Sequence, residues 1–301
     1  MLINKICLSG PEANEPEDYI SFSLGVIFPD DITNRKLHTP KTSPKLTPPV
    51  FTEHGDETHS VIYLSSTLGS LPLSLSSPSS ETNRRLFSHF LWNASLQLAT
   101  FIEEGDSSLS GTSKWEVTGE RVLELGAGTG LAGIVAALMG AQEVVISDYP
   151  APEVLENLRE NVKRNIPEDA WGDVRVEGHK WGNIGGEDQG FERESKERFT
   201  RILVADCLWM PEQHDNLLKS IRWFMAENGR AWVIAGFHTG RETMSEFYKE
   251  EKLKEAGLEV ERIYERDAEG KEREWVVDRG IEDITERKRW LVIGVLKRRV
   301  Q

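Results

Sequence analysis

The sequence predicts an α/β protein with a doubly wound sheet of seven strands, of which one at the edge is antiparallel, preceded by an irregular N-terminal region. The stretch Arg121–Tyr149 has the pattern strand, glycine-rich turn, helix, strand. Beyond it, short apolar runs alternate with amphipathic stretches as far as Lys297. The last two apolar runs are separated by the polar segment 266–288 without an evident crossover helix, which predicts an antiparallel pair at the edge.

The first 80 residues show no regular periodicity, so we divide the chain into an irregular N-terminal extension, 1–80, and one domain, 81–301. Proline and polar residues are dense in Asn34–Pro49, and serine dominates Ser65–Ser80. Short apolar pieces such as Val61–Leu64 predict extended segments and a hairpin that lies on the main domain.

A helix is predicted over Leu86–Ile102, where apolar residues recur at helical spacing and Trp92 lies beside the stripe. The Ser/Gly-rich segment Ser107–Ser113 then reads as a linker into the central unit. Ordinary packing and lining of a cofactor pocket are both open interpretations for Trp92.

The central unit begins with a buried strand, Val122–Leu125, and continues through a turn with three glycines, Gly126, Gly128 and Gly130. An almost wholly apolar helix, Leu131–Met139, leads to a second strand that ends at Asp148. Glycines allow a ligand to approach the helix N-terminus, where unpaired N–H groups carry partial positive charge. A carboxylate about 20 residues further on can accept hydrogen bonds from ribose hydroxyls, so the unit favours a nucleoside-containing cofactor.

The glycine spacing separates cofactor classes. In the dinucleotide fingerprint G-x-G-x-x-G the third glycine would stand at Leu131, but here it comes one residue earlier, at Gly130. The acidic Glu124 precedes the first glycine by two positions. A dehydrogenase is therefore disfavoured, while a tight turn without a ligand remains the alternative to a cofactor site.

The elements predicted after Asp148 alternate helix and strand apart from one exposed loop. They are the helix Pro152–Asn165, the strand Val174–Lys180, the loop Gly185–Arg198, the strand Arg201–Asp206, the helix from Pro211 to Gly229, the strand Arg230–Phe237, the helix Glu242–Ala256, and the strands Leu258–Tyr264 and Trp290–Lys297.

Ligands of an open α/β sheet bind outside the carboxyl ends of its strands, and two further strand ends carry suitable side chains. Trp181, after the third strand, either packs or stacks on a purine ring. Asp206 ends the fourth strand, where a reaction centre is expected. Cys207 beside it either packs or lies near the cofactor and is not expected to be a nucleophile, since it has no assignable base partner. The histidines lack metal-ligand spacing, so we assign no metal.

Composition excludes several classes of protein. A net charge of −14 and a pI near 5.1 argue against nucleic-acid binding through phosphate neutralisation. The two cysteines, Cys7 and Cys207, are far apart, which is typical of a reducing compartment and excludes a structural zinc site. No apolar run reaches membrane-spanning length, and the N-terminus turns acidic too early for a presequence. We expect a monomer in the cytoplasm, with the nucleus as a second location.

Several motifs resemble the class I, seven-strand methyltransferases that use S-adenosylmethionine (AdoMet), and in particular methyltransferase family 16. They are ELGAGTG at 124–130, SDYP at 147–150 and VADCLW at 204–209. HFLWNASLQLA at 89–99, DCLWMPEQHDNLLKSI at 206–221 and AGFHTGR at 235–241 are similar to its fungal branch, described as nicotinamide N-methyltransferase-like, which includes elongation factor methyltransferases. The likeness extends from about residue 86 to the C-terminus and implies a Rossmann-like fold with AdoMet as cofactor.

The residue patterns and the resemblance together give nine candidate site residues. Cofactor contacts are expected from Trp92, Glu124, Gly126, Gly128, Gly130, Asp148 and Trp181. Asp206 and Trp209 are expected to position the methyl acceptor; Trp209 stands where the family has tyrosine, which keeps an aromatic wall and removes the phenol. The expected reaction is N-methylation of a protein lysine or N-terminal amine, for instance on a translation factor. A small-molecule N-methyltransferase, as for nicotinamide, and a non-catalytic AdoMet-binding module are the alternatives.

Overall fold

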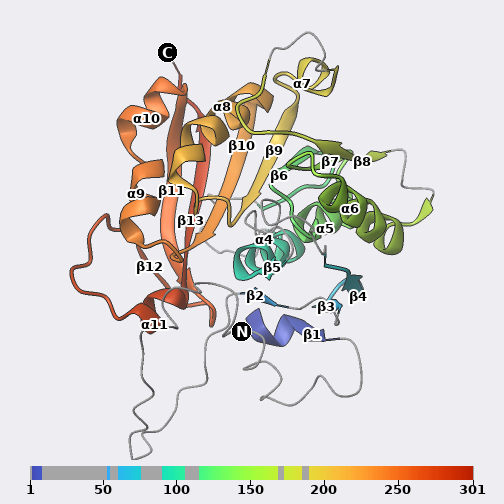
Figure 1. Cartoon of the computed structure of the whole chain (residues 1–301), viewed down its shortest axis with the longest axis horizontal. Coiled ribbons are helices and arrows are strands. Elements are labelled where there is room, and N and C mark those ends of the chain that lie inside the picture. Colours follow the sequence, from blue (N-terminus) through green and yellow to red (C-terminus); the bar gives the residue numbers. More distant parts are fainter. Residues whose placement is uncertain are drawn as a thin grey trace, which may run out of the picture.

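The computed structural model describes residues 2–8, 53–54, 60–75, 90–105, 115–168, 173–184 and 190–300. Its centre is an eight-stranded sheet in the order β12-β11-β13-β10-β9-β6-β7-β8 (Figure 1). The strands are β6 (Arg121–Leu125), β7 (Glu143–Asp148), β8 (Val174–Gly178), β9 (Phe199–Ala205), β10 (Met225–Gly236), β11 (Leu258–Asp267), β12 (Glu272–Glu274) and β13 (Trp290–Arg298). The α/β prediction and its seven strands are confirmed, and β12 is an eighth, short strand that the sequence did not predict.

Strand directions confirm the predicted antiparallel edge. The five strands β8, β7, β6, β9 and β10 pair in parallel. The last strand, β13, inserts between β10 and β11 and is antiparallel to both. The carboxyl ends of β6, β7, β9 and β10 therefore lie at one edge of the sheet.

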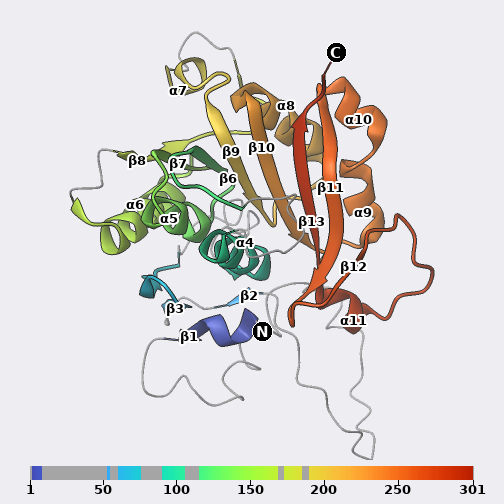
Figure 2. The same ribbon diagram turned by 180° about the vertical axis from the view of Figure 1, so that it is seen from behind.

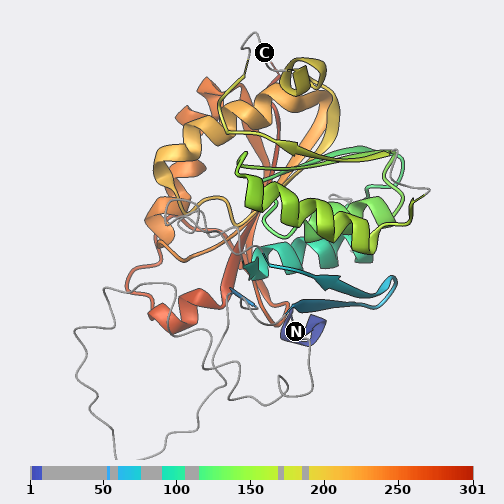
Figure 3. The same cartoon turned by 45° about the vertical axis from the view of Figure 1, so that its right-hand side comes forward.

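Helices cover both faces of this sheet, as Figure 2 and the edge-on view in Figure 3 show. One face packs against α4 (Asn93–Glu104), α5 (Leu131–Leu138) and α6 (Pro152–Asn165), and the other against α8 (His214–Phe224), α9 (Arg241–Phe247) and α10 (Glu250–Glu255). Strand side chains alternate in direction, so Val122 packs in the core on the side of α4, α5 and α6, and Leu123 packs in the core on the side of α8, α9 and α10. No helix among the described residues is long and apolar enough to cross a membrane.

Three predicted helices differ at their ends. The helix predicted from Leu86 begins at Asn93, because Leu91–Trp92 forms β5 and pairs with β2 (Glu53–His54). The helix predicted to reach Gly229 ends at Phe224, since Met225 already pairs with Phe199 of β9. The predicted helix 242–256 is split into α9 and α10, because Lys249 has an extended backbone with ψ 131°.

Short helices complete the structure: η1 (Leu2–Lys5), α7 (Gly190–Glu194), η3 (Pro211–Gln213) and α11 (Ile284–Lys288). Of these, α7 lies in the predicted loop 185–198, and α11 lies in the polar segment before β13. Some predicted segments lie outside the described residues: Asn34–Pro49, Ser76–Ser80, residues 86–89 of the predicted first helix and the Ser107–Ser113 linker.

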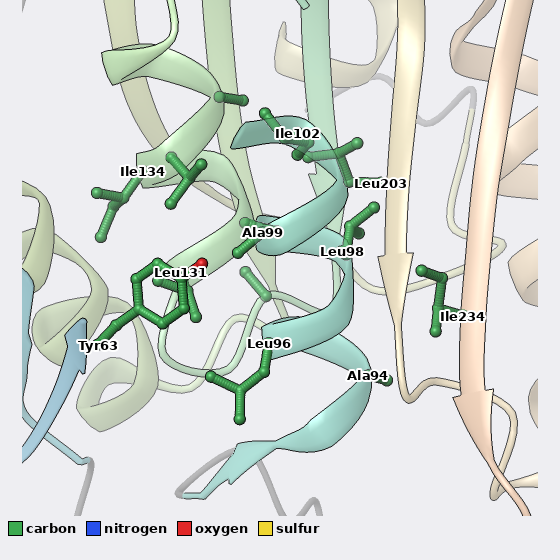
Figure 4. Packing of buried hydrophobic residues seen from close by; sticks show 14 of the residues in the cluster. Tyr63, Ala94, Leu96, Leu98, Ala99, Ile102, Leu131, Ile134, Leu203 and Ile234 are labelled. Atoms are coloured by element: carbon green, nitrogen blue, oxygen red, sulfur yellow. The ribbon is translucent and has the colours of Figure 1, made fainter. Parts of the chain in front are cut away.

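The predicted N-terminal hairpin is present. Strands β3 (Val61–Ser65) and β4 (Gly69–Leu73) pair antiparallel, and β1 (Ile6–Leu8) pairs with β3. Figure 4 shows Tyr63 of this hairpin pointing into the core beside Leu131 and the helix α4.

Asn161 of α6 connects the end of this hairpin to the glycine turn. The Asn161 side chain is fully buried; its oxygen accepts the N–H of Ser74 at 2.8 Å, and its amide donates to the Ser74 and Thr129 carbonyls at 2.9 and 3.0 Å. One buried amide therefore satisfies backbone groups of both the N-terminal segment and the turn.

Candidate functional site

One pocket lies at the carboxyl ends of the parallel strands and contains most of the predicted site. Seven of the nine predicted residues line it: Trp92, Gly126, Gly128, Asp148, Trp181, Asp206 and Trp209. They come from β5, the turn after β6, and the ends of β7, β8 and β9. The sheet topology thus collects residues up to 117 positions apart at the place where α/β sheets bind ligands.

The glycine turn is shaped by its neighbours. Gly126 and Gly128 have φ angles of 67° and 56°, a region that side chains disfavour. A Cβ at Gly126 would lie 2.6 Å from the Cys207 sulfur and 2.8 Å from Cζ2 of Trp181. The turn therefore accepts only glycine at position 126, and the Trp181 indole lies directly against it as a wall of the pocket.

Asp148 presents a buried carboxylate beside this turn. Its Oδ2 accepts the N–H of Gly128 at 2.7 Å, and its Oδ1 accepts the N–H of Tyr149 at 2.6 Å. Burial raises the pKa of Asp148 to about 6, although both hydrogen bonds oppose the rise. Each carboxylate oxygen has two acceptor sites, so both oxygens can accept one further donor.

Glu124 and Gly130 lie behind the turn and do not line the pocket. Oε2 of Glu124 accepts the N–H of Gly133 in the first turn of α5 at 2.9 Å, and burial raises its pKa to about 8. A Cβ at Gly130, where φ is 79°, would lie 2.9 Å from Cδ2 of Leu158. The geometry therefore favours support of the glycine turn by these two residues over direct contact with a ligand.

Asp206 directly follows β9 and has a φ angle of 59°, which is uncommon for a residue other than glycine. Its Oδ1 accepts the N–H of Gly236 at 3.0 Å, and its Oδ2 lies 3.0 Å from Nε2 of His238. The His238 ring also contacts Trp92, with centroids 5.0 Å apart. Sequence reasoning considers His238 only as a metal ligand; its place just after β10, the strand beside β9, is the signal that could have identified it.

Cys207 lines the pocket, whereas His214 does not, and both make structural contacts. Cys207 is buried, its sulfur lies 3.4 Å from the Leu125 carbonyl oxygen, and burial followed by nearby carboxylates raises the pKa of the thiol. Cys207 thus packs against the end of β6 and at the same time lines the pocket. His214 lies 2.9 Å from the Leu208 carbonyl oxygen. Within the described part of the chain no group of His, Cys, Asp and Glu could hold a metal ion.

Comparison with known proteins agrees with this geometry. Residues 79–254 match the model of a family described as lysine methyltransferase. The chain is 33% identical over 178 residues to the protein N-terminal and lysine N-methyltransferase EFM7 of Candida glabrata, covering 59% of this chain and 66% of that protein. The identity to efm7 of Aspergillus fumigatus is 37%, covering 44% and 49%, and to efm7 of Schizosaccharomyces pombe 31%, covering 60% and 68%.

These alignments span between about half and two thirds of the relatives' own lengths. Among solved structures, a TehB-like SAM-dependent methyltransferase from Corynebacterium glutamicum is similar, with a TM-score of 0.46 and 16% identity over 67% of this chain and 87% of that one. The family match confirms the resemblance inferred from ELGAGTG, SDYP and VADCLW. The chain belongs to the lysine methyltransferase family.

Proposed function

We propose that the protein is an AdoMet-dependent N-methyltransferase that acts on a protein lysine or N-terminal amine, for instance of a translation factor. The observation that carries the proposal is the pocket itself, which is lined by a buried carboxylate beside a glycine turn and also by a second carboxylate and three tryptophans. Family membership and the names of the relatives support the choice of a protein acceptor.

The residues at the turn fit AdoMet. Asp148 has acceptor capacity on both oxygens for the two ribose hydroxyls, and Gly126 and Gly128 leave room for close approach of a ligand to the backbone. The Trp181 indole offers a flat apolar surface to an adenine ring. When bound, AdoMet supplies a methyl group activated by its sulfonium.

Asp206 and Trp209 form the acceptor side in this proposal, and Trp92, which we place at the cofactor, adds a further aromatic wall. Methyl transfer to nitrogen is an in-line displacement, so the protein contributes mainly alignment of the nitrogen and exclusion of water. The Asp206 carboxylate orients the amine, and the indole walls hold a cationic or methylated nitrogen. The net charge of −14 favours encounter with a basic protein.

We further propose a monomer in the cytoplasm, with the nucleus as a second location, and a domain boundary near residue 80. The start of the family match at residue 79 supports that boundary. The free cysteines Cys7 and Cys207 are compatible with a reducing compartment.

Incubation with labelled AdoMet, a cell lysate and free nicotinamide tests the activity. A labelled protein band is expected, and labelled lysine or N-terminal amine in its digest identifies the acceptor nitrogen. Label only in the small-molecule fraction would replace the proposal by a nicotinamide-type enzyme. Binding of AdoMet without any transfer would leave a non-catalytic module, and binding of NAD alone would exclude the methyltransferase.

AdoMet affinity should fall as the pH is lowered through about 6. The pKa of Asp148 is raised to about 6, so below this pH the carboxyl binds a proton and loses an acceptor for the ribose. The dissociation constant measured by calorimetry should increase up to about tenfold per pH unit below that point and stay level from about pH 7 to 8. Asp148→Asn is the matched control and should give a weaker but flat profile; equal slopes for both proteins would assign the titration to another group.

A further inference from the structure

The end of β10 holds the carboxylate of Asp206 at both oxygens. Gly236 donates its N–H to Oδ1, and Nε2 of His238 lies 3.0 Å from Oδ2. An ionised carboxylate only accepts hydrogen bonds, so pairing with an ionised Asp206 requires the His238 tautomer that carries its proton on Nε2. The backbone of Asp206 is fixed as well, since its N–H donates to the Ile234 carbonyl at 2.8 Å.

Gly236 is the residue that allows this arrangement. A Cβ at position 236 would lie 2.5 Å from Nε2 and 2.9 Å from Cε1 of His238. The imidazole therefore folds back over the end of the strand into space that only glycine leaves open. This close approach is a second observation, independent of the hydrogen bond, and it places the ring against the end of β10, where the Gly236 N–H also binds Asp206.

The same ring also contacts Trp92, a second residue that lines the pocket. The centroids of His238 and Trp92 are 5.0 Å apart, with an interplanar angle of 61°. Trp92 precedes α4 and comes from a distant part of the sequence, and both Trp92 and Asp206 line the pocket, whereas His238 does not. The His238 side chain is only 11% exposed, so it lies behind these two residues.

We infer that His238 is a positioning residue that holds Asp206 and Trp92 in the geometry needed to align the methyl acceptor. The inference rests on the proposed function and adds a residue that acts through its neighbours. Without the Nε2 donor, the Asp206 carboxylate keeps one fixed oxygen and gains freedom to rotate about its terminal bond. Loss of alignment of this kind affects the transfer step and leaves the cofactor end unchanged.

Two variants separate the hydrogen bond from packing. His238→Leu keeps an apolar side chain without a donor, whereas His238→Gln retains an N–H group that can reach Oδ2. His238→Leu should lower kcat/KM for the acceptor about 10- to 100-fold, with the AdoMet dissociation constant unchanged within about twofold. His238→Gln should recover most of the loss. Thr239→Ala, at a neighbouring position in the same loop, is the control and should behave as wild type.

If kcat/KM for the acceptor falls equally in the His238→Leu and His238→Gln variants, His238 acts only by packing and the inference is overturned. The same holds if AdoMet affinity falls as much as kcat/KM does. Thermal unfolding of each variant identifies any that fail to fold. A long-range ¹H–¹⁵N spectrum of the wild-type protein tests the hydrogen bond between His238 and Asp206 and requires no activity measurement. The expected tautomer has its proton on Nε2, and a spectrum with Nε2 unprotonated would refute it, even if the wild type transferred no methyl group and the proposed function had failed.

Discussion

Replacing Asp148 by alanine should weaken AdoMet binding by about 100-fold, since two charge-assisted hydrogen bonds to the ribose are lost. The carboxylate is buried at the end of β7, and among the described residues it is the acidic group that hydrogen-bonds the glycine turn within the pocket. Isothermal titration of both proteins at neutral pH measures the effect. An affinity within about threefold of wild type would show that the ribose binds elsewhere.

Asp148→Ala also removes the acceptors of the Gly128 and Tyr149 N–H groups, so it can disturb the turn itself. Asp148→Asn is therefore the matched control, because its amide oxygen can still accept one of these bonds. We expect an intermediate loss of affinity for the Asp148→Asn variant with an unchanged melting temperature. If the alanine and asparagine variants bind equally weakly, the charge of the carboxylate is the important property, and not the shape of the turn.

Asp206→Ala should reduce kcat about 100-fold or more while the AdoMet dissociation constant changes less than about threefold. Asp206 and Trp209 both line the pocket, and the Asp206 carboxylate is held by Gly236 and His238 at the end of β10. Single-turnover transfer to the identified acceptor, at saturating AdoMet, measures this difference directly. A larger effect on AdoMet binding than on turnover would move Asp206 to the cofactor side.

The backbone of Asp206 makes the choice of control important. Its φ of 59° is tolerated best by glycine, asparagine and aspartate. Alanine at this position therefore destabilises the backbone by about 1 kcal/mol, in addition to removing the carboxylate. Asp206→Asn keeps the backbone preference and an acceptor for the Gly236 N–H but lacks the charge. If turnover of the Asp206→Asn variant equals that of wild type, the role of the carboxylate charge in orienting the amine is disproved.

The central sheet could be predicted because each buried strand is a short continuous apolar run. Val122–Leu125 and Ile202–Val204 are buried on both faces, so their sequences contain almost no polar residues to obscure the pattern. The glycine turn can be predicted because φ angles near 60° strongly favour glycine. Asp148 can be predicted because an acidic residue at the end of a buried apolar strand stands out in the sequence.

Element ends could not be predicted because tertiary contacts decide them. Leu91 continues the apolar periodicity of α4, yet it is extended since it pairs with His54 of β2. Met225 continues the apolar pattern of the helix α8, but it pairs with Phe199 and is the first residue of β10. Such pairings join residues far apart in the chain, and local propensity carries no information about them.

Only part of the candidate site can be predicted, because contacts between residues far apart in the chain also determine how its side chains are held. Strand-end residues of known chemistry, such as Asp206 and Trp181, were identified one by one. The contact between His238 and Asp206 depends on the neighbouring positions of β9 and β10 and on the absence of a Cβ at Gly236. Glu124 fits the motif, but whether a residue before the first glycine faces the pocket or α5 depends on the strand register, which the motif does not specify.

The amide of Asn161 has a thermodynamic consequence for the N-terminal segment. It binds the backbone of Ser74 after β4 and that of Thr129 in the glycine turn, so the order of the two segments is coupled. Removing this single amide would leave backbone groups of both segments without their buried partner, so one substitution at Asn161 would act on the hairpin end and on the glycine turn together.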